Sequence, residues 1–165
     1  MKIILSRKGF DSAYGGYPSP ILPDGSLISL PIPLLDSTKY SDLKLDEIRT
    51  YYDFMKGLNA KIKRDRTWHE LTKETECHLD PDLRASVVQR SENWKPCFGQ
   101  VGHSQTHLAN EGVKEGDLFL FFGWFKRTTL NKAIFQFDKS APDLHVIFGY
   151  LQIGKILQVN ANTLV

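Results

Sequence analysis

The sequence predicts an α+β domain built on a curved, mostly antiparallel sheet with flanking helices. Three observations support this prediction: a few short strands come first, helical patterns follow, and a run of strands fills the last third of the chain. Strands and helices that are separated along a chain are typical of α+β folds, whereas parallel βαβ sheets alternate the two. We therefore expect one sheet in which the strands of the last third pair antiparallel.

The first half of the chain predicts two short β elements and one helix. Residues 2–6 form a predicted buried strand, and residues 20–30 a hairpin around the turn at residues 23–26. In this turn proline fixes φ, aspartate bonds its own backbone and glycine accepts a positive φ. The helix is predicted from four apolar residues at helical spacing: Leu45, Ile48, Tyr52 and Met55. We expect it to pack on the sheet through these side chains.

The middle of the chain is less regular. Residues 60–80 are polar and have no clear period. A second helix is predicted over residues 104–110, with Ser104 as its N-cap and Gly112 as its C-cap.

The last third contains four predicted strands, at residues 118–125, 134–137, 145–153 and 155–159. Gly116 and Asp117 form a turn before the first of them, and residues 148–150 lie near the end of the third. This pattern resembles the barrel of PUA-type domains, which bind RNA or modified bases. A PUA-like β-barrel with flanking helices is therefore the alternative architecture.

Length and composition fit one globular domain over residues 1–165. The chain is 41% hydrophobic and 24% charged, and it shows no repeat or linker. A formal net charge of +2 is too small to identify a nucleic-acid-binding protein, although acidic residues elsewhere can mask a local basic groove.

Two cysteines, Cys77 and Cys97, do not make a disulfide framework in a chain of this length. We expect Cys97 to be a small buried hydrophobic residue, and Cys77, next to His78, to be the better candidate for a reactive thiol. The apolar stretch at residues 3–5 is too short for a signal peptide or a membrane span. A cytoplasmic protein without a membrane partner is therefore expected.

The segment after the first strand has the composition of a phosphate-binding loop. Arg7 and Lys8 can neutralise a phosphate, Ser12 can donate to it, and Asp11 can orient Lys8 or a sugar hydroxyl. The glycines at residues 15–16 would let backbone N–H groups approach the ligand. The spacing is not that of a Walker loop, and a structural loop with solvated charges is the alternative.

A second candidate segment carries His78, Asp80 and Asp82 on either side of Pro81. These side chains suit a histidine general base oriented by an aspartate, so we predict a catalytic role for all three and for Asp11. Metal binding is the weaker alternative, because the fixed spacing of zinc ligands is missing. The structural alternative is a turn in which Asp82 caps the next segment.

Two further segments suit recognition of a base. Amides and imidazoles at Gln100, His103, Gln105 and His107 can contact a base edge, and we predict Gln100 and Gln105 as substrate-binding residues. The aromatic run at residues 121–125 can stack on a base through one exposed ring, for which Trp124 is our choice. A solvated loop and a plain aromatic core are the structural alternatives.

Eight segments resemble the nucleotide modification associated domain 3 family, in order along the chain: MKIILSRKGFDSAYGG (1–16), PSPI (18–21), PDG (23–25), CHLDPDL (77–83), FGQ (98–100), QTHL (105–108), GDLFLFFGWF (116–125) and HVIFGYLQ (145–152). The family is named for an inferred association with nucleotide or DNA base modification in bacteria and phages. The resemblance supplies no catalytic mechanism and no cofactor. Members of the family extend past the last strand, so we expect a short version of the family or a chain that lacks a C-terminal part.

The leading hypothesis is an enzyme, or a component of one, that modifies a nucleotide or DNA base. Its partner would be a nucleotide or nucleic acid, with DNA favoured. A non-catalytic PUA-like module that recognises nucleic acid or a modified base is the first alternative, and a structural subunit of a phage or defence complex is the second. If there is one shared site, residues 7–12, 78–82 and 100–107 must meet at one concave surface.

Overall fold

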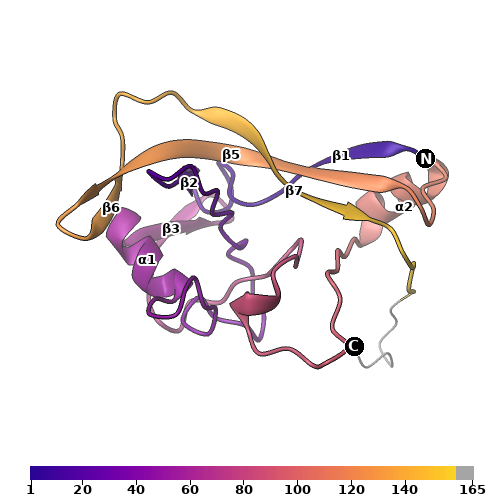
Figure 1. Cartoon of the computed structure of the whole chain (residues 1–165), viewed down its shortest axis with the longest axis horizontal. Helices are drawn as coiled ribbons and strands as arrows, with labels where there is room; N and C mark the ends of the chain where they lie inside the picture. The colour runs from indigo at the N-terminus through magenta and orange to yellow at the C-terminus, as the bar shows by residue number, and fades with distance from the viewer. Residues whose placement is uncertain (159–165) are drawn as a thin grey trace.

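The computed structural model describes residues 1–158, and its framework is one long strand, β5 (Leu118–Asn131). Two strands run parallel to β5 along one edge, β1 (Ile3–Arg7) and β2 (Ser19–Ile21). On the other edge β7 (Leu144–Gln152) runs antiparallel. The far end of β5 turns back into β6 (Ile134–Phe137). Figure 1 shows β5 spanning the length of the molecule.

The predicted sheet architecture is wrong. The main sheet is not mostly antiparallel, since both β1 and β2 run parallel to β5, and no PUA-like barrel closes within residues 1–158. Parallel neighbours need a long crossover connection, and the chain between β1 and β5 is long enough to provide it. The sequence pattern of the last third indicates only that strands follow one another there. It contains no information about pairing with β1 and β2, which are far away in sequence.

The core lies on one side of this sheet. Phe119, Phe121 and Phe125 of β5 are buried there. Figure 1 shows α1 (Tyr51–Leu58) and α2 (Gly102–Asn110) on the same side, together with β3 (Lys61–Arg64), which pairs with β4 (Thr67–Glu70). No helix within residues 1–158 covers the other face, and none has the length and apolar character needed to cross a membrane.

Both predicted helices exist, but with different starts. α1 begins after Thr50, whose hydroxyl accepts from the backbone N–H of Asp53 while the Asp53 carboxylate accepts from that of Thr50. The prediction that Ile48 packs on the sheet from this helix is wrong, because Ile48 precedes the helix and is 92% exposed. α2 begins after Val101, not at Ser104, and Val101 supplies no side-chain cap.

The strand predictions had mixed outcomes. Residues 134–137 form β6 as predicted, and the polar residues 60–80 contain the unforeseen β3–β4 hairpin. The turn at residues 23–26 forms, but a single bridge between Ile21 and Leu27 replaces the expected hairpin. Residues 155–158 are not a strand, and Val159 lies outside the described residues. A short 3-10 helix, η1 (Ala85–Val87), completes the fold.

Candidate functional site

The end of β1 places Lys8 against Asp80, a residue far away in sequence. The Lys8 Nζ lies 2.5 Å from Asp80 Oδ2, and the two side chains are only 9% and 12% exposed. The backbone N–H of Lys8 donates to the carbonyl of Phe122 on β5 at 2.8 Å. Gly123 allows this approach, because a Cβ there would lie 2.7 Å from the Lys8 carbonyl oxygen. The structure thus joins two of the predicted segments by a nearly buried ion pair.

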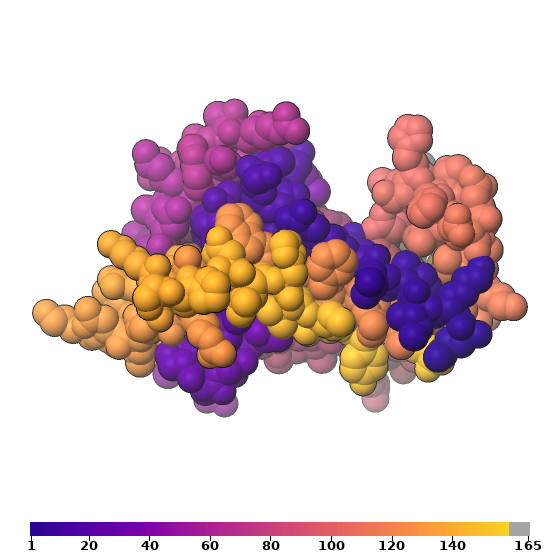
Figure 2. Space-filling view, turned by 90° about the horizontal axis from the view of Figure 1, so that it is seen from above, coloured from indigo at the N-terminus to yellow at the C-terminus, as the bar shows by residue number. Residues whose placement is uncertain are grey.

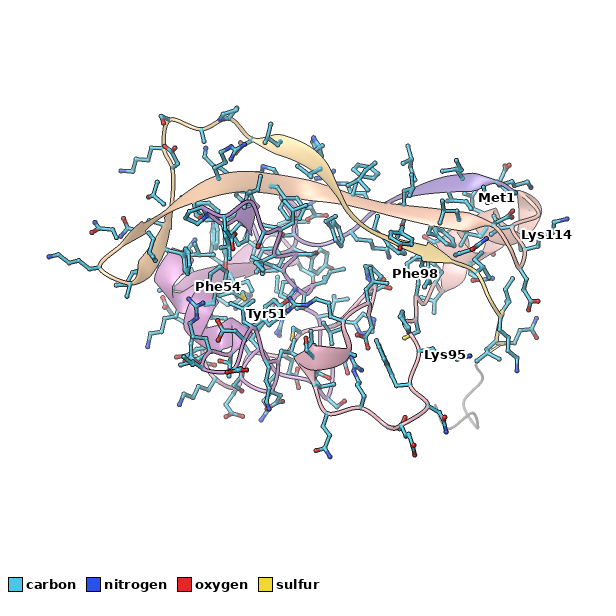
Figure 3. The ribbon with its side chains drawn as sticks, viewed as in Figure 1. Met1, Tyr51, Phe54, Lys95, Phe98 and Lys114 are labelled. Atoms are coloured by element: carbon cyan, nitrogen blue, oxygen red, sulfur yellow. The ribbon has the colours of Figure 1, made fainter. Side chains whose placement is uncertain are left out.

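The Phe98 ring covers the Lys8–Asp80 pair on the side of α2. Its ring centroid lies 4.5 Å from the Lys8 Nζ, and the ring also packs against Phe119 and Phe121 at centroid distances of 4.8 and 5.0 Å. Figure 3 shows Phe98 beneath the sheet near α2, whereas Tyr51 and Phe54 lie in the separate cluster around α1. Phe98 was not among the predicted site residues, although it belongs to the FGQ segment.

A groove of about 1110 Å³ runs beside the pair, between β1 and α2. We call it the β1–α2 groove. Its walls are β1 with Lys8, the segment with Phe98 and Gln100, part of α2, and Phe119 of β5. In Figure 2 the indigo N-terminal residues lie beside the salmon-coloured α2, the two elements that form the main walls of the groove. The volume is slightly above the range of about 300–1,000 Å³ that is usual for small-molecule sites.

The polar groups of the groove come mainly from α2 and from the end of β1. His103 and His107 lie one helical turn apart and line the same wall, with Ser104 between them. Arg7 lines the groove and is exposed, and no ion pair of Arg7 is found within residues 1–158. These groups provide hydrogen-bond donors and acceptors for a base or sugar, and a cation for a phosphate.

Of the predicted site residues, Arg7, Lys8 and Gln100 line the groove, and Asp80 lies outside the lining but pairs with Lys8. The remaining predicted site residues also lie outside the lining: His78, Asp82, Asp11, Ser12, Gln105 and Trp124. Ser12 and Gln105 are exposed, and Trp124 lies on the opposite face of β5 from the buried phenylalanines.

His78 pairs with a residue that the sequence did not indicate. Its Nδ1 lies 2.6 Å from Asp36 Oδ2, and the imidazole is 47% exposed. Burial alone would raise the pKa of Asp36, but hydrogen bonds from His78 and from the backbone of Ser37 lower that pKa below its usual value. His78 and Asp80 therefore point to different partners, despite being two positions apart.

Asp82 belongs to a second ion pair of similar burial. Arg90 Nη2 lies 2.5 Å from Asp82 Oδ1, with side chains 16% and 12% exposed, and the Arg90 guanidinium stacks over Trp94 at 4.4 Å from the ring centroid. Arg90 and Trp94 sit in a polar stretch without periodicity, so no sequence signal indicated them. Asp82 also exchanges backbone hydrogen bonds with Cys97.

Asp11 holds the shape of the loop after β1. Its Oδ1 accepts from the backbone N–H groups of Ala13 and Tyr14, both at 2.7 Å. Gly15 follows at a φ of +85°, and a Cβ there would lie 2.0 Å from the Phe10 ring. Local packing thus accounts for the aspartate and this glycine in the segment predicted to bind phosphate.

Both cysteine predictions are wrong: Cys97 was expected to be buried and Cys77 to be the candidate for a reactive thiol. Cys77 is completely buried, and burial raises the pKa of its thiol well above the usual value, which opposes a reactive thiolate. Cys97 is the exposed one.

Other clusters offer less for chemistry. A smaller pocket of about 210 Å³, beside β3 and β4, contains none of the predicted site residues. Within residues 1–158, no group of three or more histidine, cysteine or acidic side chains is placed to hold a metal ion.

Residues 1–158 thus combine a mixed sheet, with no helix on one of its faces, and a groove of polar and apolar residues beside the edge strand β1. The chain belongs to the nucleotide modification associated domain 3 family, whose model matches residues 2–164. This confirms the resemblance found in the sequence and associates the protein with nucleotide modification. No curated protein and no solved structure matches the chain.

Proposed function

We propose that the protein acts on a nucleotide or nucleic acid, with DNA favoured, and that the substrate lies in the β1–α2 groove. The observation that carries this proposal is the meeting of Lys8 and Asp80 at that groove, under Phe98. A nearly buried ion pair is costly to form, because both groups give up hydration. A site that orients a charged group for a substrate would justify that cost.

The groups of the groove suggest distinct roles. Arg7 is exposed and would bind a phosphate, since an arginine fork donates two parallel hydrogen bonds. Gln100 and His103 would contact the base edge. Lys8 lines the groove and would stabilise negative charge on the reacting group, and Asp80 would orient the ammonium group of Lys8.

Binding is tested with the four deoxynucleoside monophosphates by isothermal titration calorimetry. Arg7→Ala removes the free cation and is expected to weaken binding about tenfold or more, since a hydrogen bond to a charged group is worth about 1.5–3 kcal/mol. Arg127→Ala is the matched control, because Arg127 is an exposed arginine of β5 that does not line the groove. Equal affinities of wild type, Arg7→Ala and Lys8→Met would refute the proposed site.

Turnover separates an enzyme from a recognition module. Cells that express the protein supply their own cofactors, so nucleosides from their DNA and nucleotide pools can be compared by mass spectrometry. An enzyme should produce a new nucleoside mass that Lys8→Met and Asp80→Asn abolish and that His78→Ala preserves, because His78 pairs with Asp36 and not with a residue of the groove. Nucleotide binding without any new mass would favour the non-catalytic alternative.

A further inference from the structure

Among the described residues, no helix lies on the face of the sheet opposite the core, here called the open face. Figure 1 shows both helices on the core side, and Figure 2 views the open face, with β7 in yellow and β1 in indigo. Side chains alternate along a strand, so the register assigns each residue to one face. Arg7 and Ile147 both pair with Phe122, one on each side of β5, and Tyr150 pairs with Leu120. Paired residues have their side chains on the same face, so these five lie on the open face.

This open face carries aromatic rings. Phe122 and Trp124 of β5 lie on it beside His145 and Tyr150 of β7. Tyr150 is 72% exposed, and the rings of Phe122 and His145 are 6.3 Å apart between centroids. Aromatic rings on a sheet surface are the means by which several nucleic-acid-binding folds stack bases, typically two or three at a time.

The open face also offers a cation to a phosphate backbone. Arg7 stands on it next to Phe122 and has no ion pair within residues 1–158. Lys126 follows Trp124 along β5, but Asp143 pairs with it at 3.4 Å. Arg7 is also one of the residues that line the β1–α2 groove, so the open face and the candidate site adjoin at this position.

We propose that the open face binds single-stranded nucleic acid, whose bases stack on Tyr150 and Trp124 and whose backbone passes Arg7 into the groove. This inference rests on the proposed function and deepens it, because it makes the substrate a strand instead of a free nucleotide. Duplex bases are paired and stacked within the helix, so their ring faces are not available to these aromatic side chains.

The test is fluorescence anisotropy with labelled ten-nucleotide DNA and RNA strands and a DNA duplex. Tyr150→Ala and Trp124→Ala should each weaken single-strand binding by about fivefold or more, which is the fold-change expected for losing one stacked base. Trp68→Ala is the matched control, since Trp68 is a half-exposed tryptophan on β4, outside this sheet. A ratio of DNA to RNA affinity far from one identifies which strand is preferred.

Calorimetry with mononucleotides separates this inference from the proposed function. Tyr150→Ala should leave mononucleotide affinity unchanged, whereas Arg7→Ala should reduce the affinity for both ligands. Unchanged single-strand affinity in Tyr150→Ala and Trp124→Ala would overturn the inference while leaving the groove intact. Sedimentation velocity addresses the rival occupant: a wild-type dimer that Tyr150→Ala dissociates, without loss of strand affinity, would assign the face to a second copy of the chain.

Discussion

At the scale of single residues, the nearly buried Lys8–Asp80 pair differs from the exposed ion pairs of the surface. Lys39 and Glu74 also lie 2.5 Å apart, but their side chains are 37% and 77% exposed. Water screens an exposed pair, so it contributes about 0–1 kcal/mol, whereas breaking a buried pair leaves a charge without compensation. The same contact distance therefore predicts very different energies.

Removing one partner of the Lys8–Asp80 pair should destabilise the fold. Lys8→Met or Asp80→Asn is expected to lower the free energy of unfolding by about 3–5 kcal/mol, measured by urea denaturation. Lys39→Met, in the exposed pair, should cost less than about 1 kcal/mol. The double variant Lys8→Met/Asp80→Asn should recover part of the loss, because it leaves no unpaired charge. Additive losses in the double variant would contradict this account.

At the scale of elements, Asp117 ties the start of β1 to the start of β5. Its Oδ1 accepts from the backbone N–H of Lys2 at 2.7 Å and its Oδ2 from that of Lys114 at 3.0 Å. These hydrogen bonds, that from Lys2 foremost, hold the pKa of Asp117 below its usual value. The carboxylate thus fixes the register in which two distant strands meet.

The lowered pKa gives this junction a defined dependence on pH. A carboxyl group whose pKa is lower in the folded state adds stability above its unfolded pKa of about 4, and that stability is lost as pH falls through the folded pKa. Wild type should therefore be more stable than Asp117→Asn at pH 7, and the two unfolding curves should converge toward pH 3. Glu92→Gln, at an exposed position, is the control. A constant difference between pH 7 and pH 3 would contradict the assignment.

Elements were predictable where local chemistry decides them. β6 was predicted from alternation alone. The start of α1 is marked in the sequence by the capping pair Thr50 and Asp53, but the helix was predicted from the spacing of apolar residues that begins earlier, at Leu45. The β3–β4 hairpin was missed because its strands are short and mainly polar, with the sequences KIKR and TWHE. Its turn also places Asp65 and Arg66 at positive φ, where asparagine and glycine are the usual signals.

The candidate site was predictable in part for a related reason. Glycine, lysine and aspartate in unusual combinations indicated the segments that contain Lys8 and Asp80, whose meeting the structure shows. Partners such as Asp36 and Arg90 are common residues in polar stretches, and only the folded chain brings them to His78 and Asp82. The parallel pairing of β1 with β5 joins segments far apart in sequence, and no local sequence pattern predicts it.

At the scale of the whole molecule, β5 is the structural centre and α2 is peripheral. β5 has hydrogen-bonded partners on both edges over residues 118–122, and its inner phenylalanines are buried. α2 has no buried residue and no side-chain N-cap. One wall of the β1–α2 groove is therefore a helix held mainly by its ends and its partly buried Leu108.

Hydrogen exchange should separate these two parts of the molecule. Amides of β5 at residues 118–125 should exchange near the rate of global unfolding, and those of α2 about tenfold faster or more, because few buried contacts oppose local opening. Mass spectrometry of peptic peptides measures both in one experiment. A nucleotide bound in the groove should slow exchange in α2 more than in β5. Equal protection of α2 and β5 in the free protein would contradict this picture.

The central position of β5 also sets the order in which the protein can fold during synthesis. The backbone bond from Lys2 to Asp117 joins residues 115 positions apart, so the first strand leaves the ribosome long before its partner is made. At about 5–20 residues per second, that interval is on the order of ten seconds. During it, Ile3 and Leu5 have no sheet to join, and they are available to chaperones that bind apolar segments of nascent chains. β1 must therefore wait until β5 has been synthesised before it can take its place in the sheet.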